Sequence, residues 1–186
     1  TYDQQLITLG TPIFKERTNF LKTFIPIFKK YYSDISSGNE TVDINYKSDL
    51  NSGSFSEILH DSISKDKFLQ YTSKGIHKDD LNFTIENNRI KNFGSQGQQK
   101  SFLIALKLAQ FDYYRTEFGN SPIVLLDDIF DKLDQERVRQ IVQILEKKDF
   151  SQIFITDTHI DRVKDALSGL KNKEEIFDLE KIYSNE

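Results

Sequence analysis

The chain has 186 residues, 37% of them hydrophobic, with 25 Lys and Arg against 29 Asp and Glu. This composition supports one domain with a buried core, and no apolar run reaches the roughly 20 residues that a membrane-spanning helix needs. The net charge of −4 excludes a chain-wide basic surface for nucleic acid, and the absence of cysteine excludes disulfides, thiol nucleophiles and Cys-ligated zinc.

The sequence begins at Thr1 and contains no methionine. We interpret it as a fragment of a longer protein, or as a sequence from which methionines were omitted. We expect a soluble, cytoplasmic protein, and the absence of a signal peptide is uninformative in a fragment.

The first 35 residues form an apolar pattern that repeats every three or four positions and therefore predicts helix. Gly10, Thr11 and Pro12 are typical of a helix end, an N-cap and a first-turn proline, so we expect two successive helices. Pro26 should kink the second helix. The apolar stripe is wider than a solvent-facing helix needs, and we expect its partner in the missing part of the protein.

The next segment alternates strand and helix signals. Period-two and helical patterns predict these elements: strands over 42–46 and 81–85, and a helix over 54–72. The polar run 86–89 predicts a hairpin turn before Ile90.

From Gly94 onward the expected order is loop, long helix, apolar strand, helix, strand, helix and strand, which is an α/β order. The helix over 102–118 should be buried, and the run 123–126 should be a central parallel strand covered on both faces. A one-faced helix and a second buried strand are expected over 138–145 and 153–155.

Two adjacent carboxylates, Asp127 and Asp128, follow the apolar strand. They would lie at the carboxyl edge of a parallel sheet, where open α/β folds bind ligands. In NTPases the first acid holds Mg²⁺ and the next orients or deprotonates the attacking water. The alternative is a strand end whose acids cap a turn. Such patterns arise by chance, so this motif alone does not decide between the two interpretations.

Ser95 and Gln98 have the spacing of a capping box at the start of the long buried helix. The same geometry, with Gly97 permitting close approach, binds phosphate at a helix N-terminus. The two interpretations are compatible, so the cap alone does not decide between them.

The order of the motifs is more specific than any one of them. Ser95 precedes Asp127 by 127 − 95 = 32 residues, Asp134 follows in Leu133-Asp134, and a later strand runs into residues 156–159, Thr-Asp-Thr-His. We interpret these as the signature motif, Walker B, D-loop and switch of the C-terminal lobe of an ABC-type ATPase head. The predicted fold is therefore α/β with a mainly parallel sheet, with an N-terminal helical arm over 1–74 and the head lobe over 75–186.

Within that class the chain resembles the RecF family of bacterial recombination and gap-repair proteins, relatives of the SMC and Rad50 ATPases. The resemblance is carried by residues 75–81 (GIHKDDL), 95–100 (SQGQQK) and 125–134 (LLDDIFDKLD). ABC transporters usually have Leu-Ser-Gly-Gly-Gln and a Glu after the Walker B Asp, whereas this chain has Ser-Gln-Gly-Gln and Asp128. The resemblance covers essentially the whole chain, and the opening helices are similar to the RecF arm.

The resemblance implies that ATP is sandwiched between two subunits, with the P-loop of one facing the signature motif of the other. It implies these site residues: nucleotide contacts from Ser95, Gln96, Gly97, Gln98 and Asp134, Mg²⁺ held by Asp127, and catalytic roles for Asp128 and His159. Asp134 would cross the dimer interface. Many ABC proteins place the switch residue where Asp157 or Thr158 stands, so that position stays open beside His159.

The implied function is ATP-dependent DNA binding in recombinational gap repair, replication restart and the SOS response. ATP and Mg²⁺ would be cofactors of the full-length protein, with DNA gaps or junctions, a second copy and other recombination-mediator proteins as partners, and no membrane. The chain contains no Gly-x-x-x-x-Gly-Lys-Ser/Thr sequence. The resemblance implies a weak ATPase in the parent protein, and because this sequence is absent we expect no ATP turnover by these residues alone.

Two alternatives stay open: a nucleotide-binding subunit of a transport-type ABC system, and a non-enzymatic interaction module whose helical stripe docks another protein. His77 with the acidic pair Asp79 and Asp80 could suggest a further metal site, but a structural role is the better interpretation, because the histidines His60, His77 and His159 lack ligand spacing. Lys29 and Lys30 could contact a DNA backbone, but a solvated helix end is the better interpretation.

Overall fold

The computed structural model describes residues 2–147, 150, 152–168 and 175–179. The chain forms two compact units, one comprising residues 1–29 and 41–93 and the other residues 30–40 and 94–186. The boundary at residue 74 stays a prediction, since these units divide the chain at other points. Among the described residues, no helix combines the length and the apolar character needed to cross a membrane.

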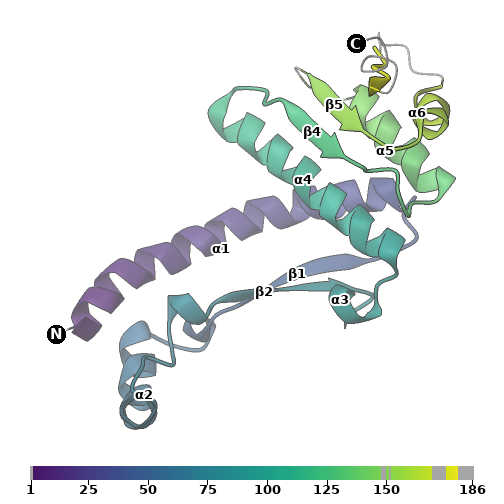
Figure 1. Cartoon of the computed structure of the whole chain (residues 1–186). Helices are drawn as coiled ribbons and strands as arrows, with labels where there is room; N and C mark the ends of the chain where they lie inside the picture. The colour runs from purple at the N-terminus through teal and green to yellow at the C-terminus, as the bar shows by residue number, and fades with distance from the viewer. Residues whose placement is uncertain (1, 148–149, 151, 169–174, 180–186) are drawn as a thin grey trace. The chain divides into compact units, whose positions relative to one another are not determined.

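The chain opens with one continuous helix, α1 (Tyr2–Ile35), so the expected break between two helices is wrong (Figure 1). Gly10 serves packing rather than helix termination: a Cβ at this position would stand 2.6 Å from Cε1 of Phe55. Pro12 lies inside the helix, where proline costs about 3 kcal/mol, and tertiary packing offsets that cost. The helix also continues through Pro26, and a kink there stays a prediction.

The first unit contains an antiparallel sheet of β1 (Val42–Lys47), β2 (Asp80–Ile85) and β3 (Asn88–Arg89), in that order. Val42 pairs with Ile85, which confirms the two strands expected from alternation. The hairpin is also confirmed, and its turn residues Glu86 and Asn87 have φ of 46° and 63°, as a tight hairpin turn requires. The apolar residues after it form a short helix, α3 (Ile90–Phe93).

The helix expected over 54–72 is α2 (Phe55–Leu69), and it begins with a capping box between Ser54 and Glu57. The short 3-10 helices η1 (Asp49–Asn51) and η2 (Ile76–Lys78) flank it along the chain. A small core unites these elements: Leu50, Phe55 and Leu59 are buried, with Ile7, Phe14, Ile58 and Ile76 packed against them.

The second unit carries the expected α/β order. Its elements after the end of α1 are α4 (Gln96–Phe118), β4 (Val124–Asp127), α5 (Gln135–Lys147), β5 (Ile153–Thr156) and α6 (Ile160–Leu167). The two strands are parallel and in register from Val124 opposite Ile153 to Asp127 opposite Thr156. The last expected strand is not found in the described residues 175–178, and residues 169–174 and 180–186 lie outside the described part of the chain.

The two-stranded parallel sheet is covered on one face only by the described residues, so the expectation of cover on both faces is wrong for this part of the chain. Leu126 is buried at 7% exposure, whereas its neighbour Leu125 is 74% exposed and Phe154 on β5 is 49% exposed. Side chains alternate between the faces of a strand, so the exposed residues mark one open apolar face.

Candidate functional site

The start of α4 is a capped helix N-terminus that is exposed to solvent. Ser95 is the N-cap: its Oγ accepts from the Gln98 N–H at 3.2 Å, and the Gln98 Oε1 accepts from the Ser95 N–H at 2.8 Å. The capping box is therefore confirmed. Ser95 and Gln96 are exposed, and among the described residues no acceptor binds the N–H groups of Gln96 and Gly97. First-turn amides and the helix dipole together attract negative groups such as phosphate.

The acid pair lies at the carboxyl edge of the parallel sheet, as expected. Asp127 is the last residue of β4, is exposed, and accepts a hydrogen bond from the Thr156 hydroxyl at the end of β5. Asp128 has a left-handed backbone, with φ of 47°. Its N–H donates to the Thr156 carbonyl at 3.0 Å, and its carbonyl accepts from Lys100 Nζ. Such a backbone costs about 1–3 kcal/mol, and these two bonds hold it in place.

The two motifs, far apart in sequence, lie against each other in this unit. Lys100, in the second turn of α4, donates to the Asp128 carbonyl. A Cβ at Gly97 would stand 3.1 Å from the carbonyl oxygen of Lys132, so glycine permits a close approach of the helix to the loop after Asp128. The fold therefore places the N-terminus of α4 beside the acidic loop.

Asp134, the predicted D-loop residue, caps the start of α5. Its carboxylate accepts from the Arg137 N–H at 2.8 Å and faces the Arg137 Nε at 3.3 Å, and its side chain is 63% exposed. Arg137 also donates to Glu40 at 2.6 Å. Sequence reasoning missed both partners. The i, i+3 spacing of Asp134 and Arg137 was an available signal, whereas nothing in the sequence connects Arg137 with Glu40, 97 positions away.

Glu40 is held as a carboxylate. Burial favours its neutral form, but hydrogen bonds from Tyr32, Gln98 and Arg137 together outweigh burial and lower its pKa below the ordinary value. Burial, followed by the hydrogen bond to Glu40, raises the pKa of Tyr32, so this phenol stays protonated as a donor.

His159, at the predicted switch position, has fewer contacts with the acid pair Asp127 and Asp128 than the start of α4 has. His159 is exposed at the N-cap of α6, and its backbone N–H donates to Asp157 at 2.8 Å. Among the described residues, no hydrogen bond connects its imidazole with Asp127 or Asp128. Asp157 has a fully buried side chain, 3.5 Å from Arg162. The catalytic role of His159 thus stays a prediction.

The donor set fits Mg²⁺ with phosphate. Asp127 offers an exposed carboxylate, the kind of single protein ligand that Mg²⁺ commonly combines with water and phosphate oxygens. No group of three or more acidic or histidine residues in the described part of the chain could hold a metal unaided. A Mg²⁺ ion at Asp127 therefore requires nucleotide or water oxygens as further ligands.

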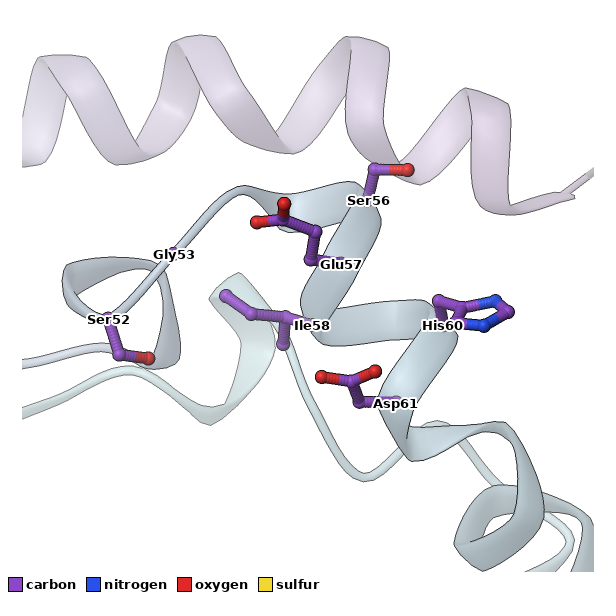
Figure 2. Close-up of a pocket in the computed structure, with 7 residues that line it drawn as sticks. All are labelled: Ser52, Gly53, Ser56, Glu57, Ile58, His60 and Asp61. Atoms are coloured by element: carbon purple, nitrogen blue, oxygen red, sulfur yellow. The ribbon is translucent and has the colours of Figure 1, made fainter.

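A hollow of about 580 Å³ lies in the first unit beside the start of α2 (Figure 2). Its lining includes Ser52, Glu57, His60 and Asp61. Figure 2 shows His60 directed away from Asp61, and Glu57 is engaged in the capping box with Ser54. The groups that line the hollow therefore do not converge on one point, and it is a weaker candidate than the edge of the β4–β5 sheet.

A scan of protein-family models found no match. Curated relatives do match over nearly the full chain. The DNA replication and repair protein RecF of Flavobacterium johnsoniae is 48% identical over 178 residues, covering 96% of this chain and 50% of the relative. The RecF of Cytophaga hutchinsonii is 47% identical over 161 residues, or 87% of this chain and 43% of the relative. The chain belongs to the RecF family. It spans about half the length of the curated RecF proteins that it matches.

Solved structures agree with this family. A structure described as the recombination mediator protein RecF-ATPrS in the RecFOR pathway matches with a TM-score of 0.68 at 26% identity, over 86% of this chain and 45% of that one. A Smc head bound to a domain of ScpA matches with a TM-score of 0.54 at 14% identity, over 87% of this chain and 42% of that one, which shows a shared fold alone. The α/β lobe of an SMC-like ATPase head, predicted from the sequence, is confirmed.

Proposed function

We propose that this chain supplies the signature, Walker B and D-loop half of a RecF-type DNA repair ATPase, in which ATP is sandwiched between two heads. The P-loop that completes each nucleotide site would come from a part of the protein outside this sequence. The proposed setting is cytoplasmic recombinational gap repair and replication restart.

One observation carries the proposal: the exposed N-terminus of α4 packs against the loop that holds the acid pair. Two contacts link the motifs. A Cβ on Gly97 would stand 3.1 Å from the Lys132 carbonyl oxygen, and Lys100 donates a hydrogen bond to the Asp128 carbonyl. An anion-attracting helix end and carboxylates that suit Mg²⁺ are the two halves of a Mg²⁺–nucleotide site.

The open face of the β4–β5 sheet supports the same proposal. Parallel strands in α/β folds are normally covered on both faces, yet Leu125 and Phe154 are exposed here. A further lobe, carrying the P-loop, would cover this face and add strands to the sheet. Relatives twice as long as this chain provide room for such a lobe.

The residues then take distinct roles. ATP supplies the γ-phosphoryl group that is transferred to water. The Ser95 hydroxyl and the Gly97 N–H would contact that phosphate from across the dimer interface, with Gln96 and Gln98 in the same turn. Asp127 would hold Mg²⁺ through water, Asp128 would orient or deprotonate the attacking water, and Asp134 would contact the opposite head.

ATP-dependent association of the full-length protein tests the sandwich. We expect ATP with Mg²⁺ to double the mass seen by light scattering, and Ser95→Arg to prevent this because a bulky cation would occupy the phosphate end of α4. Ser56→Arg, on an exposed position of α2, is the matched control and should dimerise normally. An unchanged mass of the wild-type protein with ATP would contradict the proposal.

DNA binding is proposed from family membership. It should weaken steeply with salt, because phosphate contacts release counterions. Gapped and fully duplex DNA compared at two salt concentrations would measure both strength and preference. Equal binding at low and high salt would contradict a phosphate-contacting surface.

An interaction module is the second candidate, favoured by apolar side chains exposed on the first turns of α1, such as Tyr2 at 86% and Leu9 at 68%. The Ser95→Arg variant separates the two candidates in cells. A module that only docks a protein through α1 should keep its function, whereas an ATP-driven clamp should lose repair.

A further inference from the structure

Arg137 connects three segments of the second unit. Its guanidinium donates to Glu40 at 2.6 Å and to the Ser101 hydroxyl at 3.0 Å, and its Nε faces Asp134 at 3.3 Å. The side chain is only 14% exposed. These acceptors belong to the segment after α1, to α4 and to the loop before α5, so a single side chain fixes the distances among them.

Glu40 is the second branch point. Its carboxylate accepts from the Tyr32 hydroxyl at 2.5 Å and from Gln98 Nε2 at 3.0 Å, in addition to Arg137. Its side chain is 16% exposed. Charge-assisted hydrogen bonds in such partly buried surroundings are strong and directional.

The network ends at the two motifs of the nucleotide site. Gln98 accepts from the Ser95 N–H at 2.8 Å, so the path from Arg137 to Ser95 passes through Glu40 and Gln98. Asp134 contacts Arg137 directly. Hydrogen bonds thus connect one guanidinium with both Ser95 and Asp134, which are 39 residues apart in the sequence (134 − 95 = 39).

A purely stabilising role accounts poorly for this arrangement. Apolar residues of similar volume often stabilise a fold as well as a buried ion pair does, so a buried pair is weak evidence for a stabilising role. Arg139, two residues further along α5, provides the contrast: it is 63% exposed, and within the described part of the chain its ion pair is with Glu136 on its own helix.

We propose that Arg137 is a positioning residue that sets Ser95 and Asp134 at the spacing needed to engage a nucleotide across the head dimer. The inference rests on the proposed function and deepens it. Arginine is required because its planar fork can serve several acceptors at fixed angles, which the single ammonium of lysine cannot do.

The test compares Arg137→Lys with the matched Arg139→Lys in the full-length protein. We expect Arg137→Lys to leave ATP affinity of the separate heads unchanged, because the P-loop supplies most of that binding. It should lower kcat by about 100-fold, the effect of misplacing catalytic groups by roughly an ångström. Arg139→Lys should match the wild type in both measurements.

Glu40→Gln provides a second variant that keeps the shape of the side chain if Arg137→Lys fails to fold. Because both residues act in one network, the double variant should lose no more activity than the more damaging single variant. Additive losses would overturn the proposal, as would a folded Arg137→Lys protein with wild-type kcat. A parallel loss of ATP affinity would also overturn it, since that result indicates general damage.

Hydrogen–deuterium exchange without nucleotide separates this inference from the proposed function. Arg137→Lys should speed exchange at residues 95–99 and 134–137 together, and Arg139→Lys should affect neither. If the wild-type protein neither binds ATP nor dimerises but this paired response is seen, the proposed function fails, while the role of Arg137 in fixing the spacing of Ser95 and Asp134 stands. Unchanged exchange at both segments would overturn the positioning role.

Discussion

The Lys132 carbonyl oxygen lies 3.1 Å from where a Cβ on Gly97 would stand. Lys132 itself has a left-handed backbone, with φ of 59°. This separation is tighter than ordinary van der Waals contact, so the loop and the first turn of α4 have little room to move independently. A methyl group at position 97 therefore has to displace the loop that leads to Asp134.

Gly97→Ala should destabilise the contact between α4 and this loop by about 1–3 kcal/mol, the usual cost of overpacking a tight contact, and thereby weaken ATP-dependent dimerisation. Alanine is the better helix former, so intrinsic helix propensity predicts the opposite sign. Titration of dimer formation against protein concentration measures the effect. Gly53→Ala is the control, because its Cβ would lie 3.6 Å from the Glu57 carboxylate and nothing need move. Dimerisation equal to wild type at position 97 would show that the loop yields easily.

The isolated 186-residue chain should show no Mg²⁺–ATP turnover, because it contains no P-loop sequence. In the full-length protein, Asp128→Asn should lower kcat by about 100- to 10,000-fold, as expected when a general base is removed. Asn tolerates the left-handed backbone at position 128, so the fold should survive. Phosphate release assays measure both cases. Robust turnover by the isolated chain that Asp128→Asn abolishes would mean that the site is complete without a P-loop.

Gly10→Ala should destabilise the first unit by about 1–3 kcal/mol, because its Cβ would stand 2.6 Å from the Phe55 ring. The Phe55 ring also meets the position of a Cβ on Gly75, at 2.9 Å, which leaves it little space to withdraw. Denaturant unfolding followed by tyrosine fluorescence would measure the loss. A double variant with Phe55→Leu should recover part of it, and no recovery would place the strain elsewhere.

Acid should remove the stabilisation that Glu40 provides. Its pKa is lower in the folded protein than in the unfolded chain, so its contribution is fully present above the ordinary glutamate pKa of about 4.3 and disappears as pH falls through the folded value. At pH 7, Glu40→Gln should cost about 1.5–3 kcal/mol, the range for hydrogen bonds to charged groups. Denaturant unfolding of both proteins should show that the difference between their free energies of unfolding is smaller at pH 3 than at pH 7. A difference that grows in acid would mean that folding raises the pKa of Glu40, which contradicts the inferred lowering.

Local signals in the sequence predicted most of the second unit. The Ser95–Gln98 spacing predicted the start of α4, and the apolar runs before Asp127 and around residues 153–155 predicted the parallel strands. Each of these features is set by residues within a few positions of one another, where propensity and periodicity are informative.

Long-range contacts explain what the sequence did not reveal. The Gly10-Thr11-Pro12 segment has the composition of a helix break, yet Gly10 is buried against Phe55, 45 residues later, and α1 continues. The Glu40 to Arg137 pair likewise joins residues 97 positions apart. A single sequence gives no local signal for such pairs, because their chemistry depends on the tertiary fold.

The exposed apolar face of the β4–β5 sheet has a practical consequence for handling the protein. Leu125 and Phe154 form part of an apolar surface that soluble proteins rarely leave open, and large exposed apolar patches promote association with other chains. Expressed by itself, the 186-residue chain should therefore accumulate in inclusion bodies. Co-expression with a separate polypeptide carrying the P-loop lobe should shift it to the supernatant, which makes solubility a simple screen for the complementary half.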